Sequence, residues 1–139
     1  METQVNDKVV VNPEKLQPAF PGYSHVVVSP PGRTVFISGQ TSVDVKGDIV
    51  GIDNFELQFK KAVENLDIAL RASGATFKDV TKLNYYIVNY NPDQLPAIMA
   101  TLSEYVSKDV PPAATMVSVA GLYLHELLVE IEAIAVIND

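Results

Sequence analysis

A strand near the C-terminus is predicted from the sequence Leu128-Val129-Glu130-Ile131-Glu132-Ala133-Ile134-Ala135-Val136, a mostly apolar run that two acids interrupt. Side chains in a strand alternate between its two faces, so Glu130 and Glu132 project from the same face. Their Cβ atoms would then lie only ~7 Å apart. Because a buried carboxylate without a partner is costly, this face should border water, a cleft or another subunit. The simpler interpretation is an edge strand whose acids deter aggregation.

The rest of the chain predicts an α+β fold around this strand. The preceding segment, Val110-Pro-Pro-Ala-Ala-Thr-Met-Val-Ser-Val-Ala120, indicates a Pro-bounded entry into a companion strand. We predict strands at residues 25–28, 34–38, 80–90, 115–120 and 128–137. With two helices between them, this order predicts a single mixed sheet with both helices packed on one face. The other sheet face carries many apolar side chains and needs cover, for which oligomerisation is the simplest source.

Both helices show start signals and an apolar stripe. The helix over 53–73 opens with Asp53 and Glu56 as a capping pair and stops at Gly74. The second helix opens at Asn91-Pro92, since proline fits the first helical position. The predicted buried positions are Phe55, Phe59, Ala62, Val63, Leu66 and Leu70 in the first helix and Leu95, Ile98, Leu102, Tyr105 and Val106 in the second.

Composition narrows the class of protein. A chain of 139 residues, 47% hydrophobic, suits one domain spanning 1–139, whose residues 1–11 form a polar, partly flexible N-terminal arm with a short extended run at its end. The formal net charge of −7 argues against nucleic-acid binding, which depends on Lys and Arg. Without cysteine there is no disulfide and no thiolate nucleophile. No signal peptide or membrane span is evident, so we expect a cytoplasmic protein with no membrane partner.

Other polar residues are weaker candidates for chemistry. His25 and His125 are far apart in sequence and have no companion ligands, so no metal site is predicted. His125 lies in the loop before the acidic strand, where it either lines a cleft or is simply solvated. Ser24 and Ser38 lack the setting of a nucleophile and are interpreted as structural hydroxyls. Three tyrosines of the strand at 80–90, together with Met99, are interpreted as packing residues.

Four sequence blocks, in this order, resemble the RidA/YjgF (L-PSP) family. They are Gly22-Tyr23-Ser24-His25, Val35-Phe36-Ile37-Ser38-Gly39-Gln40, Ala62-Val63-Glu64-Asn65-Leu66 running to Ala72-Ser73-Gly74-Ala75, and Pro112-Ala113 through Val129-Glu130-Ile131-Glu132-Ala133-Ile134-Ala135. The resemblance spans roughly residues 12–137. It implies a chorismate-mutase-like subunit in a homotrimeric barrel with ligand clefts between subunits. It also implies hydrolysis of imines or enamines of 2-keto acids to ketone and ammonia, without metal or cofactor.

The family's functional residues transfer to this chain only in part. In that chemistry a glutamate positions the attacking water, an arginine holds the substrate carboxylate, and a tyrosine and the glycine of Ser-Gly-Gln shape the pocket. The resemblance implies Glu130 and Tyr23 as catalytic residues, but Ala114 stands where the arginine is expected. Met99 replaces an asparagine of the second helix. The expected ligand-binding residues are Gly39, Ser38, Ala114, Thr115, Ser118 and His125.

The missing arginine changes the ligand that we expect. A charge-assisted arginine–carboxylate bond contributes ~1.5–3 kcal/mol, so its loss should weaken a bound 2-imino acid about ten-fold or more. Glu130 would also repel an anion, so a neutral or cationic ligand fits better. We expect a Rid-type protein acting on small imine, enamine or carbonyl compounds. The alternative is a non-catalytic small-molecule-binding or regulatory trimer. A ribonuclease role, assigned to some relatives, is disfavoured by the acidic charge and by the absence of a catalytic histidine pair.

Overall fold

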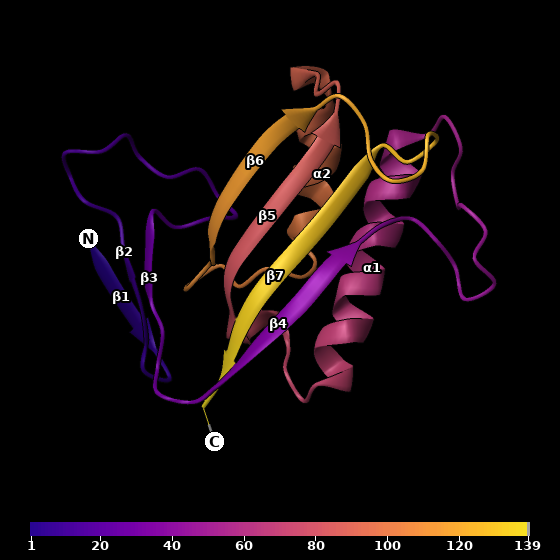
Figure 1. Cartoon of the computed structure of the whole chain (residues 1–139). Coiled ribbons are helices and arrows are strands. Elements are labelled where there is room, and N and C mark those ends of the chain that lie inside the picture. The colour runs from indigo at the N-terminus through magenta and orange to yellow at the C-terminus, as the bar shows by residue number, and fades with distance from the viewer. Residues whose placement is uncertain (139) are drawn as a thin grey trace.

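The computed structural model describes residues 1–138, which form two β-sheets and two α-helices (Figure 1). The strands are β1 (Glu2–Val5), β2 (Lys8–Val11), β3 (Val26–Val28), β4 (Arg33–Gln40), β5 (Val80–Val88), β6 (Ala113–Val119) and β7 (Val129–Ile137). The helices are α1 (Phe55–Ala72) and α2 (Leu95–Leu102), with short 3₁₀ helices η1 (Phe77–Asp79) and η2 (Pro92–Gln94) before β5 and α2. No helix in this described part is long and apolar enough to cross a membrane.

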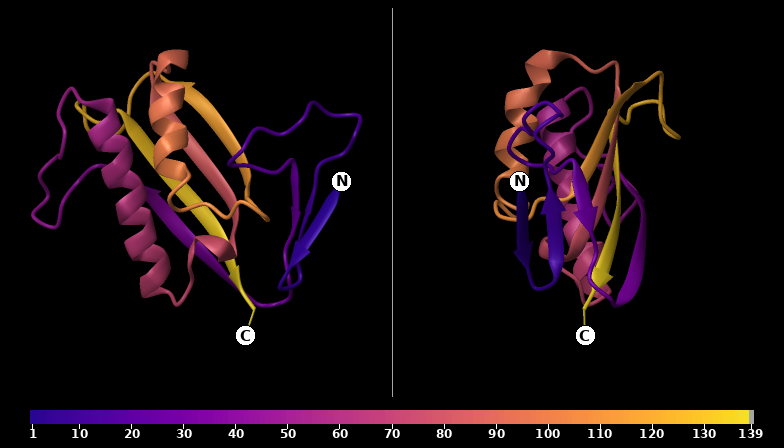
Figure 2. Two further views of the ribbon diagram at one scale, coloured as in Figure 1. Left: turned by 180° about the vertical axis from the view of Figure 1, so that it is seen from behind. Right: turned by 90° about the vertical axis from the view of Figure 1, so that its left-hand side faces the viewer.

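The larger sheet has the strand order β4-β7-β5-β6, in which only the β5–β6 pair is parallel. Both helices lie on the same side of this sheet (Figure 2), which confirms the predicted α+β architecture. The strand with the two glutamates, β7, is central rather than an edge strand. The edge-strand interpretation of Glu130 and Glu132 is therefore wrong.

The helices form where the apolar stripes predicted them, with different starts. Asn54, not Asp53, caps α1, and its side chain accepts a hydrogen bond from the amide of Leu57 at 3.0 Å. Asp53 instead has φ 60° in the turn before the helix. The second helix is divided: Asn91 caps η2, and the α-helix proper begins at Leu95. Of the positions in α2 that were predicted to be buried, Ile98 and Leu102 are buried and Leu95 is exposed.

The hydrophobic core lies between α1, α2 and the helix-facing side of the sheet. Alternate residues of β7 enter this core and the others point to the opposite face, which we call the open face. The helix-facing residues of β7 are Val129, Ile131, Ala133 and Ala135, and the open-face residues include Glu130, Glu132 and Ile134. The alternation predicted from the sequence therefore fixes which side of β7 carries the acids.

The N-terminal strands form a second sheet, in the order β1-β2-β3, beside the main one (Figure 1). Residues 1–11, expected to be a polar arm, thus form a β-hairpin, with the predicted extended run as β2. Lys8 attaches this sheet to the main one, because its buried Nζ donates hydrogen bonds to the carbonyls of Lys78 (3.3 Å), Val80 (2.7 Å) and Val110 (2.7 Å). The predicted single mixed sheet describes β4–β7 only.

Candidate functional site

Glu130 occupies space that only a glycine at position 39 leaves open. Pairing between β4 and β7 shifts register between Ile37 and Gln40, which brings Gly39 against Glu130. A Cβ added to Gly39 would lie 2.6 Å from Cδ and 2.8 Å from Cγ of Glu130. The Ser-Gly-Gln block therefore accommodates the carboxylate of a neighbouring strand, and the two predicted site residues are in contact.

The two glutamates of the open face have different surroundings. Tyr86 donates a hydrogen bond to Oε1 of Glu132 at 2.5 Å, and this bond raises the pKa of Tyr86. Glu130 pairs in register with Tyr86 but accepts no hydrogen bond from residues 1–138. Glu130 therefore keeps both oxygens available for water or a ligand, whereas Glu132 already accepts a hydrogen bond from Tyr86.

The rest of the open face mixes polar and apolar groups. Thr115 lies on this face, where its hydroxyl accepts a hydrogen bond from Nζ of Lys82 at 2.8 Å. Phe36 and Val117 are 78% and 39% exposed there. These exposed apolar side chains share the open face with half-buried Ile134.

Tyr23 and Ala114 lie on the other side of the main sheet. Both line an apolar cavity of about 450 Å³, here called the β6 cavity. Its lining comes from α2, β5, β6 and the segment at residues 20–23, and includes Phe20, Tyr23, Tyr85, Met99, Ala114 and Met116. Ala114 faces this side because it pairs with the buried Leu83 in the parallel β5–β6 ladder. One cavity thus contains Tyr23, which matches the family site, and Met99 and Ala114, which depart from it.

The segment that carries Tyr23 is fastened to the start of β6. The buried Ser24 donates from Oγ to the carbonyl of Pro111 at 2.6 Å, and from its amide to that of Pro112 at 2.8 Å. The ring of Tyr23 packs edge-on against His25, with centroids 5.6 Å apart. Ser24 is therefore a structural hydroxyl that places Tyr23 beside the strand of Ala114.

Within one chain the expected site residues do not form one cluster. Gly39 and Glu130 meet at the open face, whereas Tyr23 and Ala114 meet behind the sheet. The remaining expected residues are more peripheral. Ser38 and Thr115 are exposed, Ser118 accepts a hydrogen bond from the amide of Tyr90 at 2.9 Å, and His125 is exposed in the loop before β7.

Gln58 is a buried polar residue that the sequence did not single out. Its Nε2 donates to the carbonyls of Gly51 (3.2 Å) and Glu126 (3.0 Å), and its Oε1 accepts from the amide of Leu128 (2.9 Å). It therefore ties α1 to the start of the strand that carries Glu130. The only sequence signal was a glutamine beside Phe59 on the apolar stripe.

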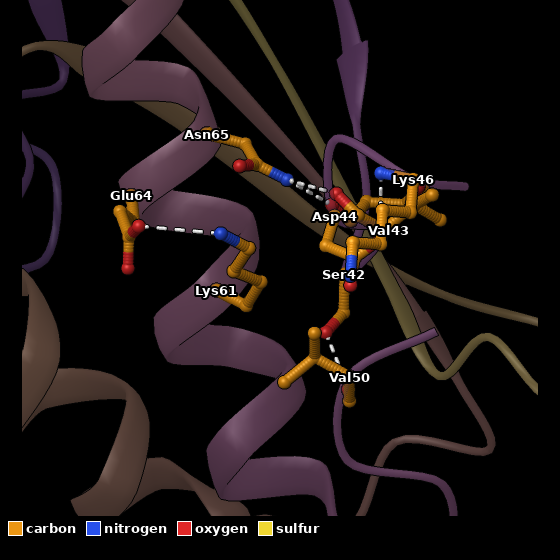
Figure 3. Close-up of polar contacts among 9 residues, drawn as sticks. Ser42, Val43, Asp44, Lys46, Val50, Lys61, Glu64 and Asn65 are labelled. Atoms are coloured by element: carbon orange, nitrogen blue, oxygen red, sulfur yellow. Dashed lines mark hydrogen bonds and ion pairs between the residues drawn. The ribbon is translucent and has the colours of Figure 1, made fainter. Parts of the chain in front are cut away.

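A second amide of α1 holds the loop that follows Gly39 (Figure 3). Nδ2 of Asn65 donates to the carbonyls of Thr41 at 2.8 Å and Val43 at 2.9 Å. Within the loop, Ser42 donates to the carbonyl of Val50 at 2.5 Å. The two arms of this loop meet at a single β-bridge between Val43 and Ile49. The segment that follows Gly39 is thus attached to α1.

Among residues 1–138, no group of three or more His, Asp or Glu side chains is placed to hold a metal ion. The polar groups of the expected site are the carboxylate of Glu130 on the open face and the hydroxyl of Tyr23 behind the sheet. Such a set can orient and deprotonate a water molecule.

Comparison with known proteins agrees with this architecture. The family model described as Endoribonuclease L-PSP matches residues 14–137. The chain is 34% identical over 131 residues to a 2-iminobutanoate/2-iminopropanoate deaminase of Dermatophagoides farinae, a match that covers 94% of this chain and 97% of the relative. The chain belongs to the RidA/YjgF (L-PSP) family.

Solved structures of the family have the same fold. The Rid-family protein YyfB from Yersinia pestis, described as of unknown function, has 39% identity and a TM-score of 0.88, over 94% of this chain and 98% of that one. RidA from the Antarctic bacterium Psychrobacter sp. PAMC 21119 has 27% identity and a TM-score of 0.66, over 92% and 98% of the two chains.

Proposed function

We propose that this protein is a cytoplasmic homotrimer that hydrolyses small imines or enamines in clefts between its subunits, without a cofactor. The observation that carries the proposal is the carboxylate of Glu130, which rests over Gly39 on the open face and has no hydrogen-bond partner within the described chain. A carboxylate in this setting is suited to bind and orient one water molecule. The relative of Dermatophagoides farinae, which is named as a deaminase, supports the reaction class.

The reaction adds water across the C=N bond and then eliminates ammonia, with proton transfers but no change of oxidation state. Glu130 accepts a proton from water while the water oxygen bonds to the imine carbon. The π electrons of the C=N bond move to nitrogen, which takes up a proton. The resulting carbinolamine loses ammonia as its C–O bond becomes C=O, so one imine and one water give one ketone and one ammonia. An enamine first takes a proton at carbon and then follows the same course.

The expected site residues lie in two separate groups, and this separation supports trimer formation. Glu130 and Gly39 lie on the open face of the sheet, and Tyr23 and Ala114 lie beside its edge strand β6. A neighbouring subunit packed on the open face would cover Phe36 and bring its own Tyr23 toward Glu130. The cleft is then complete only in the assembly.

A non-catalytic binding protein is the second candidate, and the β6 cavity favours it. The cavity is apolar and is large enough for a small ligand even if no chemistry follows. Ribonuclease activity, which the description of the family model names, is less well supported because the chain carries a formal net charge of −7.

The experiment compares wild-type protein with Glu130→Gln. An amine oxidase generates neutral imines in place, an amino-acid oxidase generates 2-imino acids, and ammonia release is followed against the uncatalysed rate. We expect faster release from neutral imines with wild-type protein only. Equal rates with and without protein would favour the binding alternative, and cleavage of RNA would favour the ribonuclease. Light scattering should give about three times the chain mass of 15.1 kDa, and a monomer would remove the inter-subunit cleft.

A further inference from the structure

The β6 cavity has no charged lining, unlike the other two cavities described in this fold. Its twelve lining residues include no Asp, Glu, Lys, Arg or His. Lys108 and Asp109 line a second cavity, between α2 and the N-terminal sheet, which adjoins the β6 cavity along residues 20–23, Met99 and Leu102. Lys8 and Asp79 line a third. A carboxylate or phosphate lodged against this lining would lose part of its hydration without gaining a countercharge from the lining, which disfavours anions.

One buried polar atom among the residues that line this cavity lacks a hydrogen-bond partner within the described chain. Tyr85 lines the cavity and is 3% exposed, and its hydroxyl makes no hydrogen bond with any described residue. Its ring is held by stacking on Phe59, with centroids 6.3 Å apart and planes at 25°. Burial raises the pKa of Tyr85, so the hydroxyl stays protonated and can donate. Buried hydroxyls are nearly always paired, so we expect a water molecule or a ligand in the cavity to accept this hydrogen bond.

The residue at position 114 keeps the cavity open. Ala114 lies on β6 beside Met116, and both side chains pack toward the core. Alanine ends at Cβ, so the space that a longer side chain would fill is part of the cavity. Ala114, which stands where the family arginine is expected, therefore contributes apolar surface to the cavity.

We propose that the β6 cavity binds the apolar body of a neutral ketone or imine, with the Tyr85 hydroxyl donating a hydrogen bond to its oxygen or nitrogen. The cavity volume of about 450 Å³ lies in the range of small-molecule pockets. This inference rests on the proposed function only in identifying the cavity ligand with the substrate. It names the substrate class as uncharged and largely apolar, in place of a 2-imino acid.

The methionines provide a direct probe of binding. The chain has three, of which Met99 and Met116 line the cavity and Met1 is 86% exposed. Protein with ¹³C-labelled methionine methyl groups is titrated with 4-phenyl-2-butanone, a neutral ketone. The matched anion is 2-oxo-4-phenylbutanoate, in which a carboxylate replaces the terminal methyl group. We expect the ketone to shift the methyl resonances of Met99 and Met116 but not that of Met1, and to bind more tightly than the acid.

Two variants test separately how the Tyr85 hydroxyl and the cavity volume contribute to binding. Tyr85→Phe should bind the ketone roughly three- to ten-fold more weakly, the equivalent of one net hydrogen bond. Its unfolding temperature should be unchanged or higher, because it removes an unpaired hydroxyl. Tyr105→Phe, which removes a hydroxyl outside the cavity, is the control and should bind normally. Ala114→Leu should abolish binding by filling the cavity, and if it fails to fold, the Tyr85 comparison still decides.

The outcomes separate this inference from the proposed reaction. Equal or tighter binding of the acid, equal affinity of Tyr85→Phe, or shifts spread to Met1 would overturn the inference. Ketone binding at Met99 and Met116 without hydrolysis of any imine would uphold the cavity ligand and remove the proposed reaction. Hydrolysis of neutral imines by protein that binds no ketone in the cavity would uphold the proposed reaction and overturn the cavity ligand.

Discussion

Replacement of Gly39 by alanine should inactivate the protein while leaving it folded. The added Cβ would lie 2.6 Å from Cδ of Glu130, whereas carbon atoms at optimal separation are ~3.5–4.0 Å apart. Oε2 of Glu130 lies closer still, so the carboxylate must move by at least about 1 Å. A misplacement of this size in a catalytic group costs about 10²-fold in rate.

The cost in stability should be much smaller. Overpacking a rigid core costs ~1–3 kcal/mol, but the obstructed atoms here are the end of a flexible, half-buried side chain on the open face. Rotation of Glu130 away from residue 39 relieves the contact, so we expect a loss below ~1 kcal/mol. The predicted signature is a rate defect that is far larger than the stability defect.

A double-mutant cycle with Glu130→Ala tests the physical cause. Urea unfolding should show that Gly39→Ala loses its stability cost once Glu130 is truncated, because the obstructed carboxylate is gone. Gly121→Ala is the matched control, since a Cβ at that position meets nothing within 4 Å. Imine hydrolysis at the wild-type rate by Gly39→Ala, or the same stability cost in both backgrounds, would refute this reasoning.

Three further predictions concern other parts of the fold. Ala114→Arg should lower the half-saturating concentration of 2-imino acids about ten-fold or more, with a smaller effect on kcat, in steady-state ammonia-release assays; an unchanged value would show that this position does not face the substrate. Burial lowers the pKa of Lys8 from 10.5 to about 8, against the opposing effect of Asp79. Because the unfolded chain then binds more protons between these pH values, the free energy of unfolding should rise by up to about 3 kcal/mol from pH 8 to pH 10.5 and stay flat just below pH 8. Lys8→Met should abolish that rise in urea titrations. Gln58→Leu leaves the carbonyl of Glu126 and the amide of Leu128 without partners and should cost about 2 kcal/mol or more in urea unfolding, whereas Leu57→Ala, at an exposed neighbouring position, should cost little.

The sequence alone determined the strands of the main sheet, the first helix and the faces of the strands. Period-two alternation placed Glu130 and Glu132 on one face, and helical spacing selected the buried side of α1. These features follow from local geometry, which repeats every two residues in a strand and every 3.6 in a helix. The position of β7 inside the sheet did not follow, because strand order depends on contacts between distant segments.

The site was only half predictable. Gly39 and Glu130 were both identified, but their contact depends on a register shift between β4 and β7 that no local pattern specifies. The sequence likewise assigned Tyr85 to packing, which is correct for its ring and says nothing about its hydroxyl. Whether a buried hydroxyl finds a partner depends on every element around it.

The N-terminal sheet and the division of the site show the same limit. Lys8 looks like an ordinary surface residue in the sequence, and only packing of β2 against residues 78–80 and 110 gives its ammonium three carbonyl partners. Tyr23 and Ala114 were expected with Glu130 in a cleft between subunits, and within one chain the sheet separates them from Glu130. Local periodicity fixed the direction of each side chain, and the pairing of distant strands decided what each of them meets.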